Sequence, residues 1–243
     1  MAENVKLAEN VILVDVAYFN DVVKDLKRYF ELQLGRPLQN IYVEEWASYL
    51  ALDSGIRDKD NNIEVLFVHD SQTNKLLHCD PSDLNKDLNG VGYTNQLGEF
   101  TFTSVSSEGL VPRANLYLDL LNIALNSADV KRLMLVPFID DYGAKLMEVL
   151  DEYLRNADTE NSKGLFLFNM DEPAHPLGCK WDLLGYSMMR ALGIKAEELN
   201  VLIGSDAVED ADIKEAVKLN TLMLLHEKYG ITERDFTRAE IEV

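Results

Sequence analysis

Residues 132–154 place a short apolar run, an acidic turn and a helical pattern one after another. Residues 133–136 are continuously apolar, Asp140 and Asp141 follow, and apolar residues recur at helical spacing from Leu146 onward. A short run that is apolar on both faces is typical of a parallel strand covered by helices on both sides. In such sheets, ligands bind outside the carboxyl ends of the strands. This stretch therefore predicts a parallel α/β fold with Asp140 and Asp141 at the ligand-binding edge.

Strand and helix patterns alternate along most of the chain. Further core strands are predicted over residues 11–14, 63–68 and 165–168, and helices over residues 21–34, 44–52, 112–126 and 181–192. This alternation predicts a three-layer α/β fold with a mostly parallel sheet. Residues 75–79 and 100–105 are expected to pair with each other as an inserted β-hairpin.

The composition changes after Ile194, which divides the chain into an α/β domain over residues 1–194 and a helical C-terminal extension over residues 195–243. A long amphipathic helix is predicted over residues 206–229. Isolated helices gain little stability from propensity, so its apolar stripe must be buried, either on its own domain or on a second subunit. We expect a homodimer that forms through the C-terminal helices.

The balance of charges limits the choice of partners. The 243 residues include 23 Lys plus Arg and 42 Asp plus Glu, which gives a formal net charge of −19. Such a surface repels nucleic-acid phosphates, so RNA is disfavoured as a partner, although a metal-dependent enzyme is not excluded. Cys79 and Cys179 show no metal-ligand spacing, and neither a signal peptide nor a membrane-length apolar run is present. We therefore expect a cytoplasmic protein with free thiols and no membrane partner.

Acidic residues follow the predicted strands. Asp15, Asp70, the pair Asp140–Asp141 and Asp171 all lie at or just past strand ends. If the sheet is parallel, Asp15, Asp140, Asp141 and Asp171 are predicted to share one edge. Clustered carboxylates repel one another unless a cation is present, and Mg²⁺ prefers oxygen ligands. The alternative is that each aspartate caps backbone N–H groups, which is common at such positions.

The acidic turn resembles a motif of the NYN branch of the PIN-like nucleases. That family has a hydrophobic strand, then Ser-Gly-Asp-Ser-Asp-Phe, then a helix. In LVPFIDDYGAKLMEVL, Asp141 and Tyr142 match the Asp-Phe of the motif, whereas its first aspartate falls on Ile139, next to Asp140.

Two further segments resemble the same family. The helix NLYLDLLNIAL places Asp119 on the aspartate of the family's Ala-Leu-Ala-Ile-Asp-Leu-Leu, but the preceding acid of that helix falls on Arg113. The first strand VILVDVAYFN places Asp15 on the family's aspartate, and the nearby asparagine is matched loosely by Asn20. The resemblance covers roughly residues 11–171 and departs from the family at two acidic positions.

The resemblance implies a PIN-like fold and metal-dependent RNA cleavage. Asp15, Asp119 and Asp141 would then bind Mg²⁺ or Mn²⁺, with Asp140 and Asp171 as supporting catalytic acids. The two missing acids fit equally with a catalytically degenerate relative. The competing hypothesis is a non-enzymatic interaction or oligomerisation protein on the same scaffold. A basic groove beside the acids would favour the nuclease, and an exposed apolar patch without such a groove would favour the interaction protein.

Overall fold

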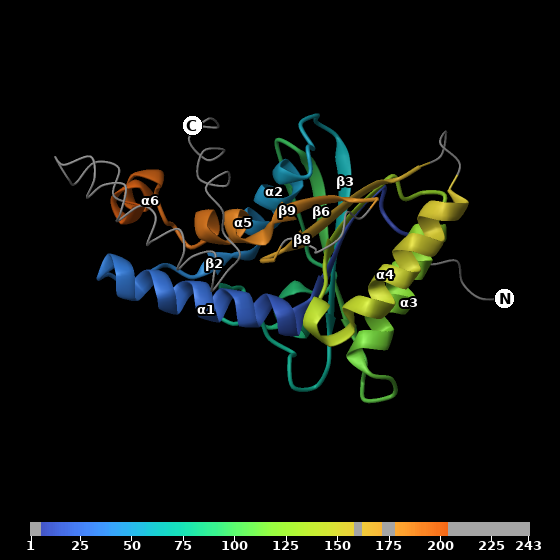
Figure 1. Cartoon of the computed structure of the whole chain (residues 1–243), viewed down its shortest axis with the longest axis horizontal. Coiled ribbons are helices and arrows are strands. Elements are labelled where there is room, and N and C mark those ends of the chain that lie inside the picture. Colours follow the sequence, from blue (N-terminus) through green and yellow to red (C-terminus); the bar gives the residue numbers. More distant parts are fainter. Residues whose placement is uncertain (1–5, 158–161, 172–177, 204–243) are drawn as a thin grey trace.

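A seven-stranded sheet forms the centre of the molecule. The structure is a computed structural model that describes residues 6–157, 162–171 and 178–203 (Figure 1). The strand order is β5-β6-β3-β1-β7-β8-β9, and every neighbouring pair is parallel except β5 and β6. The strands are β1 (Asn10–Asp15), β3 (Asn61–His69), β5 (Gly92–Asn95), β6 (Gly98–Ser106), β7 (Arg132–Val136), β8 (Gly164–Asn169) and β9 (Lys180–Leu183). The predicted mostly parallel α/β sheet is confirmed.

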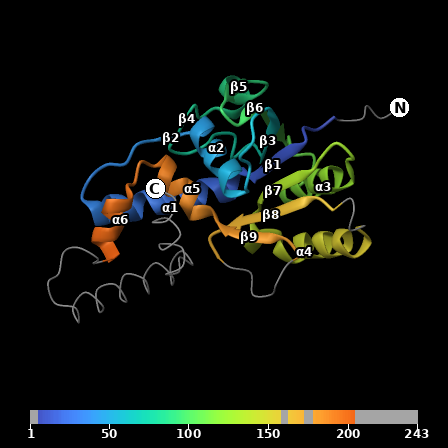
Figure 2. The ribbon, with the colours of Figure 1, turned by 90° about the horizontal axis from the view of Figure 1, so that it is seen from above.

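Helices cover both faces of this sheet. One face carries α1 (Val16–Leu34), α2 (Val43–Asp53) and α5 (Leu184–Ala191), and the other carries α3 (Arg113–Asn126) and α4 (Ile139–Asn156). Figure 1 shows the two helical layers on opposite sides of the strands. A sixth helix, α6 (Ala196–Ile203), lies beside the C-terminal end of α1, where Arg36 binds Glu198, as the view in Figure 2 also shows.

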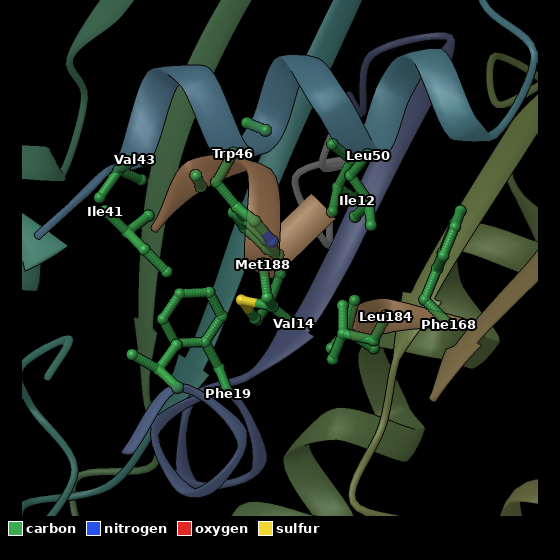
Figure 3. Packing of buried hydrophobic residues seen from close by; sticks show 14 of the residues in the cluster. Ile12, Val14, Phe19, Ile41, Val43, Trp46, Leu50, Phe168, Leu184 and Met188 are labelled. Atoms are coloured by element: carbon green, nitrogen blue, oxygen red, sulfur yellow. The ribbon is translucent and has the colours of Figure 1, made fainter. Parts of the chain in front are cut away.

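The central strand β1 is buried on both faces, which explains its uninterrupted apolar sequence. Ile12 and Val14 point into the core beneath α1, α2 and α5, whereas Val11 and Leu13 point into the core beneath α3 and α4. All four are fully buried. Figure 3 shows the first of these cores, in which Trp46 also packs edge-on against another aromatic ring, that of Phe19, with ring centroids 4.8 Å apart.

The predicted hairpin between residues 75–79 and 100–105 is wrong. Strand β6 pairs in parallel with β3 and in antiparallel with β5, so the hairpin at this edge is formed by β5 and β6. Residues 79–80 form a short strand β4 (Cys79–Asp80), which pairs with β2 (Ile41–Tyr42) in a separate two-stranded sheet. The segment between β4 and β6 is rich in Asn, Asp and Gly, which predicts a loop, but it contains the π-helix η1 (Leu84–Leu88) and β5.

Gly98 permits the close approach of the β5–β6 turn to β3. Its φ is +134°, and a Cβ at this position would lie 2.1 Å from the carbonyl oxygen of Asn61. A larger residue is therefore excluded sterically, and this glycine fixes where β6 begins.

Two predicted helix starts are also corrected. Asn20 directly precedes the predicted helix and could cap it, but α1 begins at Val16, because the side chain of Asp15 accepts the N-terminal backbone hydrogen bonds. The Asn20 side chain instead bonds the backbone of Lys75 and Leu77 in the loop after β3. The helix predicted over residues 181–192 starts only at Leu184, since the residues before it form the edge strand β9.

The spacing of Leu116, Leu120, Ile123 and Ala124 predicts that these residues form the buried stripe of α3. Only Ala124 of these is buried, and the buried face consists of Tyr117, Leu118, Leu121, Ala124 and Leu125. The long helix predicted over residues 206–229 and most of the C-terminal extension lie outside the described residues, so the division into two domains stays a prediction. Within the described ranges, no helix has both the length and the apolar character needed to cross a membrane.

Candidate functional site

The carboxylate of Asp15 lies at the carboxyl end of β1 and accepts four hydrogen bonds. Its Oδ1 accepts from the backbone nitrogens of Ala17 (3.0 Å) and Tyr18 (3.2 Å), which caps α1. Its Oδ2 accepts from the hydroxyl of Tyr142 (3.0 Å) and from Nη1 of Arg113. A carboxylate offers about four lone-pair positions. All of them are occupied here by groups of the chain itself.

The side chain of Asp15 is fully buried. Burial raises its pKa above the ordinary value, and the charge of Arg113 together with the hydrogen bonds lowers that pKa without cancelling the effect of burial. The ionised form of Asp15 therefore depends on these donors.

Arg113 is the first residue of α3, and its guanidinium lies among three aspartates. Besides Asp15, its Nη2 binds Oδ2 of Asp141 at 2.9 Å, and its Nε lies 3.8 Å from Oδ2 of Asp70. The guanidinium also lies over the ring of Phe138, 5.6 Å from the centroid. The Arg113 side chain is only 11% exposed. A planar guanidinium with five N–H donors suits this arrangement, which joins the ends of β1 and β3 to the first turns of α3 and α4.

Tyr142 completes the arrangement from within α4. Its φ of −136° and ψ of 20° interrupt the helix. The Tyr142 hydroxyl accepts a hydrogen bond from the backbone nitrogen of Phe138 at 3.1 Å while it donates to Asp15. Burial raises the pKa of Tyr142 far above its ordinary value, so this hydroxyl stays protonated and acts as a donor to Asp15.

The remaining predicted site residues lie outside this cluster. Asp140 and Asp171 are exposed. Burial raises the pKa of Tyr18, and the charges of Asp171 and Asp140 raise it further, which places both acids within electrostatic range of that residue. Asp119 is exposed on α3, six residues beyond Arg113, a rise of about 9 Å along the helix axis.

The structure brings together Asp15 and Asp141 of the predicted metal ligands, with Arg113 between them. In the part of the chain that the structure describes, no three His, Cys, Asp or Glu side chains are grouped so that they could hold a metal ion. Binding of Mg²⁺ or Mn²⁺ by Asp15, Asp119 and Asp141 stays a prediction.

Two of the residues that organise the site, Arg113 and Tyr142, are not indicated as site residues by the sequence. In the sequence, Arg113 is only a basic residue at a position where the resembled family has an acid. Tyr142 only occupies the position of the phenylalanine in the family's motif. Asp70 lies at a predicted strand end but is not among the acids that the sequence predicts at the shared edge. Because β3 is parallel to β1, Asp70 shares the edge of Asp15.

The surface around the cluster is acidic and partly apolar. Leu110 is 83% exposed and Val111 is 40% exposed in the loop directly before Arg113. Three described depressions, of about 620, 390 and 280 Å³, lie near the opposite ends of the strands or between the C-terminal ends of α3 and α4. None of these three adjoins Asp15.

Residues 4–199 match DUF6621, a family of unknown function. The chain belongs to this family. The match spans the described α/β sheet and the first half of α6, so the Arg113 cluster lies within the DUF6621 region. No solved structure matches the chain significantly.

Short parts of the chain are similar to probable M18 family aminopeptidases. The protein of Clostridium acetobutylicum is 48% identical over 50 residues, which are 21% of this chain and 11% of that protein. The protein of Thermotoga maritima is 40% identical over 77 residues, which are 30% of this chain and 17% of that protein. The chain therefore spans less than a fifth of the length of these relatives.

Proposed function

We propose that this DUF6621 chain is a catalytically degenerate relative of the PIN-like nucleases that functions through binding. Two features support the relationship to these nucleases: the resemblance of three segments to the NYN branch, and the parallel sheet with acids at its carboxyl edge. We propose binding and not hydrolysis because of one observation: hydrogen-bond donors of the chain itself occupy the Asp15 carboxylate completely.

A divalent ion needs oxygen lone pairs that are directed at it. Mg²⁺ holds near-octahedral geometry at short range and takes one or two carboxylates together with waters. The Oδ2 atoms of Asp15 and Asp141 both bind the guanidinium of Arg113. An ion between these two carboxylates would have to displace a side chain that carries the opposite charge to both of them. Metal activation of a water molecule at this point is therefore disfavoured.

The surroundings favour the interaction hypothesis over hydrolysis. Leu110 and Val111 are exposed apolar residues directly before Arg113 in the chain, and the guanidinium of Arg113 lies beside Asp70 and Asp141. These are the features that we associated with an interaction protein and not with a nuclease that holds a polyanion. A homodimer through residues 195–243 remains part of this proposal.

The similarity to aminopeptidases supports no activity of this chain. A segment that matches 11 to 17% of an aminopeptidase covers too little of that enzyme to carry its reaction. We therefore do not extend peptide hydrolysis to this protein.

Titration calorimetry and a cleavage assay test the proposal together. The wild-type protein should give no binding heat with Mg²⁺ or Mn²⁺, and it should leave fluorescent single-stranded RNA intact with either ion at millimolar concentration. Binding of either ion that Asp141→Asn weakens, together with metal-dependent cleavage, would restore the nuclease hypothesis. Glu148→Gln is a matched control, since Glu148 is exposed on the same helix two turns away.

A further inference from the structure

We propose that Ser104 is a nucleophile that His69 activates, and that this pair gives the chain an acyl-transfer activity on short, uncharged esters. Neither Asp15 nor Arg113 takes part in this activity. It goes beyond the binding function proposed above, and either proposal can fail without the other.

The hydroxyl of Ser104 and the ring of His69 are in hydrogen-bond contact. Oγ of Ser104 lies 2.8 Å from Nε2 of His69, which is within the range for a hydroxyl nucleophile and its general base. His69 is the last residue of β3, and Ser104 lies near the end of β6, the parallel neighbour of β3. The pair therefore lies towards the carboxyl edge of the sheet, where ligands bind in parallel α/β folds.

The backbone determines which nitrogen of His69 carries the proton. Nδ1 lies 3.1 Å from the carbonyl oxygen of Asp70, which can only accept a hydrogen bond. In the neutral imidazole the proton therefore resides on Nδ1, and the lone pair of Nε2 faces the Ser104 hydroxyl. The ring is 1% exposed, so the packing around it holds this orientation. A general base needs this orientation in order to remove the proton of a serine.

Asn85 controls where the proton of Ser104 goes. The hydroxyl has two acceptors, Nε2 of His69 and Oδ1 of Asn85, which lies 2.9 Å from Oγ. A half-turn of the Asn85 carboxamide exchanges its oxygen for its nitrogen, which then donates to Oγ and leaves the hydroxyl proton to His69. An amide nitrogen at this position is also a suitable donor for the oxyanion that forms during acyl transfer.

Exposure and charge indicate the class of substrate. The side chain of Ser104 is half-buried whereas His69 is buried, so a substrate reaches the nucleophile from solvent. The net charge of −19 repels anionic acyl donors, which favours uncharged esters.

The reaction has two steps, and water is its only co-reactant. Oγ of Ser104 bonds to the acyl carbon, its proton passes to Nε2 of His69, and the alcohol leaves with that proton as the ester C–O bond breaks. Water then bonds to the acyl carbon and gives a proton to Nε2, and this proton returns to Oγ as the bond between Oγ and the acyl carbon breaks. The products are a carboxylic acid and an alcohol.

Labelling with a fluorophosphonate tests the nucleophile. Oγ attacks the phosphorus of this reagent and fluoride leaves, which gives an adduct that peptide mass spectrometry locates. The native wild-type protein should form the adduct on Ser104 and should hydrolyse p-nitrophenyl acetate. A general base contributes about 100- to 10,000-fold, so His69→Gln should slow the labelling at least about 100-fold. Ser104→Ala should lose both the adduct and the hydrolysis.

Ser106→Ala is the matched control. Ser106 lies two residues further along the same strand and is also half-buried, and its hydroxyl accepts a hydrogen bond of 3.2 Å from the backbone nitrogen of Glu108. This variant should form the adduct and hydrolyse the ester at the rates of the wild type.

Three results would overturn the inference. They are a native wild type without an adduct on Ser104, labelling that His69→Gln does not slow, and ester hydrolysis that persists in Ser104→Ala. If His69→Gln does not fold, the wild type unfolded in urea takes its place, because unfolding separates Ser104 from His69. The native protein should then be labelled at least about 100-fold faster than the unfolded protein, and equal rates would overturn the inference. None of these results depends on metal binding at Asp15, which calorimetry tests separately.

Discussion

The hydroxyl of Tyr142 provides a precise test of how the carboxyl edge is held together. Tyr142→Phe removes one oxygen atom and leaves the ring in place between Tyr117 and the core. The substitution breaks two hydrogen bonds, one donated to Asp15 at 3.0 Å and one accepted from the backbone nitrogen of Phe138 at 3.1 Å.

The size of the effect follows from the two partners. A hydrogen bond to a charged group contributes about 1.5 to 3 kcal/mol, and a bond between neutral groups about 1 kcal/mol. The free energy of unfolding should therefore fall by about 2 to 4 kcal/mol, because Asp15 is fully buried and cannot recover its lost donor from solvent.

Urea denaturation followed by circular dichroism measures this loss. The control is Tyr153→Phe on the same helix, whose hydroxyl accepts a single long hydrogen bond of 3.4 Å from Lys163 and lies half-buried. The control should lose less than about 1 kcal/mol. A Tyr142→Phe protein that is as stable as the control would refute the view that donors of the chain hold Asp15 in place.

Three further predictions follow from other parts of the chain. A thiol reagent should modify native Cys179 slowly, because burial raises the pKa of its thiol to about 11. The reaction rate should rise with pH up to that value, since the thiolate is the reactive form. Burial raises the pKa of Cys79 further, so Cys79 should react only after the protein unfolds. Trp46→Ala should destabilise the protein by about 3 to 5 kcal/mol in urea denaturation, whereas Leu32→Ala, at a position that is 74% exposed, should change stability by less than about 0.5 kcal/mol; equal effects would contradict the described core. Removal of residues 205–243 should leave the α/β domain folded and convert a dimer into a monomer in light scattering; a full-length monomer at micromolar concentration would refute the dimer, and a truncated protein that fails to fold would place the tail in the core.

The layers of the fold were predictable because they depend on local patterns. The apolar runs at β1, β3, β7 and β8 are buried on both faces, so sequence alone indicated a covered parallel sheet. The pairing of the edge strands was not predictable, because it depends on long-range contacts. Nothing local to residues 75–79 indicates that Cys79 pairs with Ile41.

The candidate site was predictable only where strand direction determined it. Asp15 and Asp141 were expected at one edge and lie there, because both follow parallel strands. Asp119 is a candidate only through the resemblance of its helix to the nuclease family, and that resemblance does not show that its side chain is exposed on α3. The position of Arg113 depends on how the first turn of α3 meets three other elements, which no sequence spacing shows.

The position of the cation among these aspartates tests the central claim most directly. A crystal structure of the wild-type protein grown with Mn²⁺, with anomalous data collected for that ion, locates it without reference to activity. Our account predicts the Arg113 guanidinium between Asp15 and Asp141, with no anomalous peak within coordination distance of either carboxylate. An anomalous peak bound by Asp15 and Asp141, with Arg113 displaced, would contradict it.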